Sequence, residues 1–158
     1  MKNVSTLPCL IARSLALFGD SWSMLIMRDA HAGLTRFEEF RKSLGIAPTM
    51  LSNRLATLTE EGLLEKRRYS KRPCRDEYLL TPEGLDLLPV LLALAVWGRK
   101  HRGGGEFARF YDVEAETEID LVSIDRATGA PIGTRPLRLA RPSAPLGESD
   151  NDGVRPIT

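Results

Sequence analysis

Residues 35–63 contain two amphipathic segments separated by a glycine, and this arrangement limits the fold more than any other feature of the chain. Gly45 interrupts the helical spacing, and Pro48 is suited to the first position of the helix that follows. Apolar residues recur at intervals of three and four on both sides of the glycine: Phe37, Phe40 and Leu44, then Leu51, Leu55 and Leu58, with Leu63 just past the second helix. We predict two helices joined by a tight turn, which is typical of a helix-turn-helix unit.

The second of these helices carries small polar residues opposite its leucines. At about 100° per residue, Thr49, Asn53 and Ala56 point away from the apolar side, and Ser52 and Thr57 flank them. The pattern therefore predicts a helix with one buried face and one polar face directed into solvent.

Two further helices are expected before this unit. The first spans residues 7–18, and the second begins at a cap, either Asp20 or Ser21. The third helix begins with the form of a capping box, in which the Thr35 hydroxyl and the Glu38 carboxylate would satisfy free amides.

A basic hairpin is predicted directly after the helix-turn-helix unit. Residues 64–68 and 77–81 have the composition of two short strands. Six basic residues lie within ten positions on and between them: Lys66, Arg67, Arg68, Lys71, Arg72 and Arg75. Three helices, a recognition helix and a charged hairpin in this order predict a winged helix.

The next segment is apolar on every side. Thr81 and Pro82 are a cap and a first helical residue, and Pro89 should kink the helix that follows. A helix without a polar face must be covered all round, and residues 87–97 are too few to cross a bilayer. We therefore expect a homodimer interface shared with the N-terminal helix, with these residues in it: Leu10, Leu88, Leu91, Leu92, Ala95 and Trp97.

The net charge of +1 hides a division of the chain. Residues 1–102 hold 16 basic and 11 acidic residues, whereas residues 103–158 hold 6 basic and 10 acidic ones. Three consecutive glycines at 103–105 indicate a flexible joint between the two parts. We predict a DNA-binding and dimerisation domain over 1–102, an acidic appendage over 103–140 and a disordered tail over 141–158.

The appendage is expected to be a β-hairpin. Residues 117–124 and 132–139 flank a turn-rich link at 125–130, and residues 106–113 have the pattern of a short helix. The expected fold class is thus mainly α with a small β component: a winged helix-turn-helix domain, a C-terminal hairpin and a disordered tail.

The stretch from Cys9 to Arg102 resembles the HxlR-type winged helix-turn-helix transcriptional regulators of bacteria and archaea. The similar segments, in order, are CLIAR at 9–13, WSMLIMR at 22–28, RFEEF at 36–40, IAPTMLSNRL at 46–55, LTEEGL at 58–63, YLLTPEG at 78–84 and LLPVL at 87–91. Two positions depart from the family pattern: Ser21 replaces an Arg or Lys before the tryptophan, and Ala47 replaces a frequent Ser before Pro48. The resemblance implies a dimeric DNA-binding regulator that acts at a promoter. It also implies that some relatives sense oxidants or electrophiles through a cysteine at the position of Cys9.

Double-stranded DNA is accordingly the expected partner. We expect base contacts in the major groove from Thr49, Ser52, Asn53 and Thr57. Contacts to phosphates or the minor groove are expected from the basic residues Arg36, Arg54, Lys66, Arg67, Arg68, Lys71, Arg72 and Arg75. The regulator, expected to repress, should bind a two-fold symmetric operator. The alternative is a winged-helix module that binds proteins without specific DNA binding.

The two cysteines leave two interpretations open. Cys9 is either a small buried thiol or a redox sensor, and Cys74 near the wing tip could be its partner in oxidation. Two cysteines cannot form a disulfide framework, so a reducing cytoplasm is the expected location. His31 and His101 stand in no metal-binding or catalytic spacing, so we expect no enzyme activity, no cofactor and no metal. No export signal or membrane helix is expected, and no residue identifies a small-molecule effector.

Overall fold

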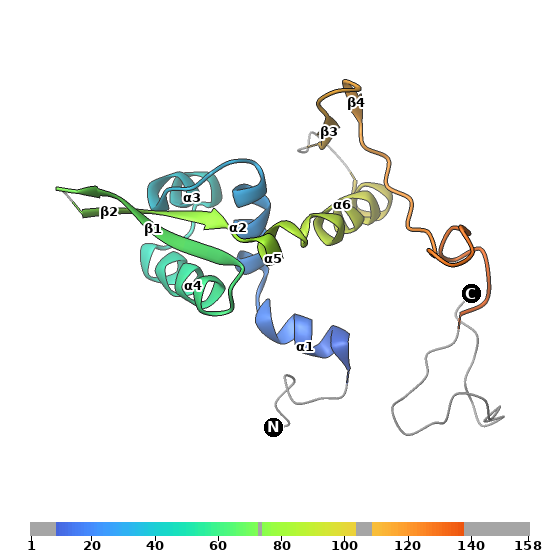
Figure 1. Ribbon diagram of the computed structural model, residues 1–158, viewed down its shortest axis with the longest axis horizontal. Coiled ribbons are helices and arrows are strands. Elements are labelled where there is room, and N and C mark those ends of the chain that lie inside the picture. Colours follow the sequence, from blue (N-terminus) through green and yellow to red (C-terminus); the bar gives the residue numbers. More distant parts are fainter. Residues whose placement is uncertain (1–8, 73, 104–108, 138–158) are drawn as a thin grey trace. The chain divides into compact units, whose positions relative to one another are not determined.

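The computed structural model describes residues 9–72, 74–103 and 109–137. The chain divides into two compact units, one ending at Gly103 and the other beginning at Gly104. The elements of the first unit are α1 (Leu10–Leu17), α2 (Ser21–His31), α3 (Phe37–Leu44), α4 (Pro48–Glu60), β1 (Leu64–Lys71), β2 (Cys74–Leu80), α5 (Pro82–Leu85) and α6 (Leu88–Arg102) (Figure 1). The second unit contains β3 (Tyr111–Asp112) and β4 (Thr117–Glu118).

The first unit is a winged helix, as the sequence predicts. Helices α2, α3 and α4 pack together, and the antiparallel hairpin β1–β2 projects beyond them (Figure 1). The buried core is formed by Ile26, Met27, Ala30, Phe40, Ile46, Leu51, Leu55, Leu58, Leu63, Leu64 and Leu91. The expected fold class, mainly α with a small sheet, is confirmed.

Helix α2 begins at Asp20, one of the two predicted caps. The Asp20 carboxylate accepts hydrogen bonds from the backbone amides of Trp22 at 2.8 Å and Ser23 at 3.2 Å. Such a cap contributes about 1 kcal/mol to stability.

The predicted capping box of α3 is wrong in both members, because Arg36 and not Thr35 occupies the cap position and Glu39 replaces Glu38. Glu39, and not Glu38, accepts hydrogen bonds from the amides of Thr35 at 3.0 Å and Arg36 at 2.9 Å. The physical reason is that the helix begins one residue later than the pattern suggested, with Arg36 at the cap position, so the third helical residue is Glu39. These amides lower the pKa of Glu39, whereas Glu38 pairs with Arg41 at 2.8 Å.

The wing is longer than predicted and is joined to the segment before α3. Strand β1 extends to Lys71, and β2 begins at Cys74. The register between the two strands is irregular near Tyr69. An isolated bridge pairs Arg36 with Glu77, and the amide of Tyr78 donates to the carbonyl of Thr35 at 2.7 Å. One isolated bridge and one hydrogen bond therefore attach β2 to the segment before α3.

The predicted helix after the wing is divided into two. Thr81 caps α5 as expected, because its hydroxyl accepts the amide of Gly84 at 3.1 Å and donates to the carbonyl of Gly62 at 2.6 Å. The helix breaks at Asp86 and Leu87 and resumes as α6, with Pro89 in its first turn. Proline is tolerated there because the first amides of a helix have no partner within it.

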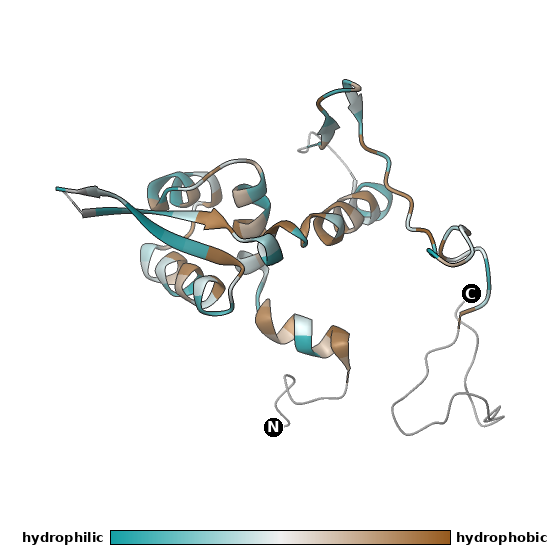
Figure 2. Cartoon of the chain, in the orientation of Figure 1, coloured by the Kyte–Doolittle hydropathy of each residue, from teal (hydrophilic) through white to brown (hydrophobic). Residues whose placement is uncertain are grey.

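Helices α1 and α6 are rich in apolar residues (Figure 2), and several of their large apolar side chains are exposed. Leu10 is 78% exposed in α1, and Leu94 and Trp97 are 54% and 53% exposed in α6. In the described part of the chain, no single helix is long and apolar enough to cross a membrane. Helices α1 and α2 pass that test only as a pair, and they meet at a bend of 80°.

The second unit differs from the expected appendage. Tyr111 and Asp112, placed in a predicted helix, form a strand that pairs with Thr117 and Glu118. The Asp112 carboxylate accepts the amides of Glu114 and Ala115, which stabilises a turn in place of a helix. In place of the expected hairpin of 117–124 and 132–139, the described residues show a single bridge, Ile124 with Pro131, and a hydrogen bond from the amide of Ile132 to the carbonyl of Ser123 at 2.8 Å, around a turn held by Asp125. The predicted disordered tail, 141–158, lies outside the described residues.

Gly84 provides a test of the packing between α5 and the turn after α4. A Cβ at Gly84 would overlap the carbonyl oxygen of Leu63, so Gly84→Ala should lower the free energy of unfolding by about 1–3 kcal/mol. Chemical denaturation measures this loss. Gly98→Ala in α6 is the control, because a Cβ there meets no atom within 4 Å and alanine favours a helix. Equal stability of the Gly84→Ala and wild-type proteins would contradict the close contact.

Candidate nucleic-acid interface

The solvent-facing side of α4 carries most of the residues predicted to contact bases. Leu51, Leu55 and Leu58 are fully buried, which turns the opposite face outward. Thr49, Ser52 and Asn53 are exposed on that face. Thr57 is only half-buried and its hydroxyl donates to the carbonyl of Asn53 at 3.1 Å, so its donor is used within the helix. Three of the four residues are thus brought together, and their side chains form no hydrogen bond to any residue that the structure describes.

Met50 is an exposed residue of this helix that the sequence analysis omitted. It is 41% exposed and stands one position after Thr49. An apolar side chain can contact a thymine methyl group in the major groove. The sequence signal for the exposure of Met50 was its position in the first turn of the helix, after Pro48. The signal is weak, because an apolar side chain on a helix is more often buried.

The start of α4 has backbone amides without a side-chain cap. Ala47 occupies the cap position and Pro48 the first helical position. The replacement of a frequent Ser by Ala47 therefore leaves the start of α4 without a side-chain cap. Uncapped amides at a helix start can donate to an anion such as a phosphate.

Arg54 is engaged inside the domain. Its Nε lies 2.9 Å from Oδ2 of Asp20, the residue that caps α2. The Arg54 side chain is 35% exposed. A phosphate contact for Arg54 stays a prediction, and the structure adds a second role, since the pair links α4 to the start of α2.

Three wing cations are paired with carboxylates of the opposite strand. Lys66 and Arg68 contact Asp76 at 3.1 and 3.5 Å, and Arg67 contacts Glu77 at 2.8 Å. The hydrogen bond between Lys66 and Asp76 raises the pKa of Lys66 and lowers the pKa of Asp76. The cationic groups are half-exposed or more, whereas both carboxylates are sheltered. The wing thus presents its cations outward over a layer of acid groups, which lowers its net charge.

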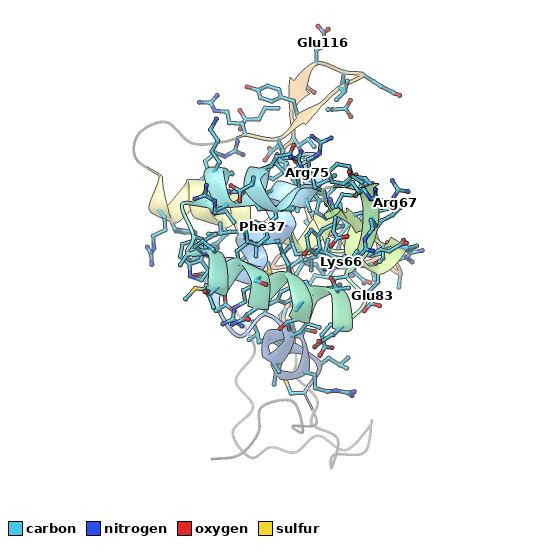
Figure 3. All side chains as sticks on the ribbon, turned by 90° about the vertical axis from the view of Figure 1, so that its left-hand side faces the viewer. Phe37, Lys66, Arg67, Arg75, Glu83 and Glu116 are labelled. Atoms are coloured by element: carbon cyan, nitrogen blue, oxygen red, sulfur yellow. The ribbon has the colours of Figure 1, made fainter. Side chains whose placement is uncertain are left out.

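The other basic residues of the predicted set differ from these three. Arg36, Arg72 and Arg75 are exposed and form no ion pair with any residue that the structure describes. The Arg36 guanidinium lies 4.9 Å from the centre of the Tyr69 ring, an interaction that the sequence pattern did not indicate. In Figure 3, Arg75 lies on the side of the hairpin nearer α3, and Arg67 lies on its outer side. The side chain of Lys71 is outside the described part.

Cys9 is exposed, so the interpretation as a buried thiol does not hold within one protomer. It stands at the cap position of α1, where Leu10, Ile11 and Leu15 are exposed as well. The helix has no buried residue, so it offers the thiol no core to enter. The side chain of Cys74 is not among those described.

The residues predicted for the dimer interface fall into two groups. Leu91 and Leu92 are buried within the protomer, Leu91 in its core, while Leu10, Ala95 and Trp97 are exposed and Leu88 is half-buried. The prediction omitted Val90 and Leu94, which are exposed apolar residues of α6. Periodicity could not separate the two sides of α6, because both are apolar.

The described residues contain no group of three or more His, Cys, Asp or Glu side chains that could hold a metal ion. His31 contacts the carbonyl of Gly84 at 3.1 Å, and His101 lies against Trp97. Both histidines therefore have structural neighbours.

Comparison with curated proteins finds relatives named as regulators. Over 91 residues the chain is 41% identical to an uncharacterized HTH-type transcriptional regulator of Mycobacterium bovis, which covers 58% of each chain. It is 33% identical over 95 residues to the uncharacterized HTH-type transcriptional regulator YdeP of Bacillus subtilis, covering 60% of this chain and 74% of that one. The chain thus matches less than two thirds of the mycobacterial relative's length.

Solved structures with the same fold have similar descriptions. PA1607, described as a candidate transcription factor, has a TM-score of 0.78 at 35% identity, covering 87% of this chain and 97% of its own. The reduced form of the redox regulator HypR has a TM-score of 0.57 at 29% identity, covering 60% and 94%. The family model of HxlR-like helix-turn-helix proteins matches residues 17–105, which is more than half of the chain. The chain belongs to the HxlR-like helix-turn-helix family.

Proposed function

We propose that this protein is a sequence-specific DNA-binding transcriptional regulator that binds a two-fold symmetric operator as a homodimer. The observation that carries the proposal is the exposed polar face of α4 beside a hairpin with unpaired arginines. A major groove admits one helix, and a basic hairpin beside that helix can reach the flanking phosphates or the minor groove.

The dimer is supported by unsatisfied apolar surface. Large side chains of α1 and α6 are exposed in the protomer, and burial of each is worth about 1.5–3 kcal/mol. Two copies joined through these helices would present two recognition helices to one duplex. A bound dimer would exclude other proteins from a promoter, so we propose that the regulator represses.

Selection from a pool of random duplexes tests this function. The purified protein should enrich a two-fold symmetric sequence whose half-sites are about one helical turn apart, or a multiple of it. Failure to retain any duplex at low salt would support the alternative of a protein-binding module, because the exposed arginines should give at least nonspecific affinity.

Asn53→Ala should weaken binding to the selected operator by about 1–3 kcal/mol and change nonspecific binding little. The reason is that an asparagine can form two hydrogen bonds to adenine, whereas a phosphate contact would serve every sequence equally. Fluorescence anisotropy on the operator and on a scrambled duplex measures both affinities. Equal losses on the two duplexes would remove Asn53 from the base-contacting residues.

Arg72→Ala should lower the slope of log affinity against log salt concentration by about one unit. Arg67→Ala is the matched control and should lower it less, because Glu77 already neutralises Arg67 at 2.8 Å. Titration over a series of salt concentrations gives both slopes. Equal decreases in the two variants would show that the carboxylates under the wing do not reduce its interaction with phosphates.

Leu94→Asp should convert the dimer to a monomer and weaken operator binding by at least about tenfold, since a charge would be buried at the interface. Analytical ultracentrifugation measures the oligomeric state. Met50→Asp, an equivalent change at an exposed apolar residue of α4, should leave the dimer intact. A dimeric Leu94→Asp protein would place the interface elsewhere.

We assign an oxidant response to Cys9. Its side chain is exposed, and the similar protein HypR is described as a redox regulator. The thiol oxidant diamide should change the operator affinity of the wild type but not of Cys9→Ser. An equal change in both proteins would exclude Cys9 as the responsive group.

A further inference from the structure

A cavity of about 610 Å³ lies between the start of α3 and the wing. Arg36 and Phe37 line it from the α3 side, and Tyr69, Arg75 and Tyr78 line it from the hairpin. Phe37 and Arg75 lie near each other at this side of the hairpin in Figure 3. Its volume is in the range of small-molecule sites. The base-contacting face of α4 contributes no residue to it.

Each of the three carboxylates in the lining already has partners. Glu39 accepts the amides of Thr35 and Arg36 at the start of α3. Glu38 pairs with Arg41 at 2.8 Å. Asp76 is shared by two wing cations, at 3.1 and 3.5 Å. The negative charge in the wall of the cavity is therefore compensated within the protein.

The two arginines of the lining are not compensated in this way. The side chain of Arg75 has no ion pair or hydrogen bond with any described residue. Arg36 has its guanidinium stacked on the Tyr69 ring at 4.9 Å, and it forms no ion pair within the described part either. Stacking holds the guanidinium plane while its N–H groups stay available to an anion. The cavity thus offers two guanidinium groups that form no ion pair with a described residue, although Glu39, whose pKa is lowered by the Thr35 and Arg36 amides and by the charge of Arg36, partly offsets that charge.

The two tyrosines add aromatic surface to these charges. The hydroxyls of Tyr69 and Tyr78 form no hydrogen bond to a residue that the structure describes. Tyrosine rings favour planar aromatic partners, and guanidinium groups favour carboxylates and phosphates. The combination suits a ligand that has both an aromatic ring and an anionic group.

We propose that this cavity binds a small aromatic anion, either an aromatic carboxylate or an aromatic phosphate ester, as an effector. Arg36 and Arg75 also belong to the residues proposed to contact DNA phosphates. A ligand on these arginines removes two phosphate contacts and anchors an anion against the wing, so it releases DNA. This regulatory step rests on the proposed function, whereas the binding of the anion does not.

Isothermal titration calorimetry of the full chain with phenyl phosphate tests the site. Inorganic phosphate at equal ionic strength is the control without a ring, and phenyl phosphate should bind at least about tenfold more tightly. Arg75→Gln and Tyr69→Leu should each weaken phenyl phosphate binding about tenfold. Arg67→Gln removes an equal charge from the outer side of the wing, where Glu77 pairs with it, and should change the affinity less than about twofold.

The outcomes separate the parts of the proposal. Absence of saturable phenyl phosphate binding, or an equal loss in Arg67→Gln, would overturn the site. Equal affinities for phenyl phosphate and inorganic phosphate would overturn the aromatic specificity. If the wild type binds duplex DNA but phenyl phosphate releases it no better than inorganic phosphate does, the effector role is wrong. If the wild type binds no duplex, the proposed function fails while the calorimetry still decides the site.

Discussion

The burial of one face of α4 is the constraint on which the rest of the first unit depends. Leu51, Leu55 and Leu58 are inaccessible to solvent and pack with Phe40 of α3 and Ile26 of α2. Because successive residues of a helix differ by about 100°, fixing these leucines also fixes the direction of Thr49, Ser52 and Asn53. The same packing places β1 directly after the helix, since Leu63 and Leu64 continue the buried surface. A nonpolar interaction thus determines which polar groups the protein presents.

The net positive charge of the wing is lower than the number of its basic residues suggests. Six basic residues within ten positions suggest a strongly cationic hairpin, but two carboxylates on β2 neutralise three of them. Ion pairs between exposed side chains contribute little to stability, about 0–1 kcal/mol each. Their larger effect is to orient the basic side chains and to lower the net electrostatic field of the wing. Arg36, Arg72 and Arg75 form no ion pair with a described residue, so their guanidinium groups stay available to an external anion.

Much of the fold could be predicted from the sequence because its signals are local. Helical spacing of leucines, the caps at Asp20 and Thr81 and the proline at position 48 each act within one turn of the chain. The glutamate that completes the α3 capping box could not be chosen from the sequence, since two adjacent glutamates fit the pattern. Only the position at which the helix starts decides between them. The break between α5 and α6 was expected as a kink at Pro89, but the proline in fact begins a new helix.

The candidate site was less predictable, because its properties arise from residues far apart in sequence. The pair between Arg54 and Asp20 joins positions separated by more than 30 residues, and Asp76 lies across the hairpin from its two cations. Neither contact has a periodic signal. The exposure of Cys9 was equally hidden, since Leu10, Ile11 and Leu15 suggest a buried helix whereas α1 has no buried residue in the protomer.

Asp20 connects the start of α2 to α4. The Asp20 carboxylate caps the start of α2, in the turn that follows α1. The same carboxylate neutralises Arg54 in the middle of α4. A rotation of α1 that disturbed the first turn of α2 would also change the electrostatic support of α4. One shared carboxylate therefore makes the start of α2 and the middle of α4 respond to the same displacement.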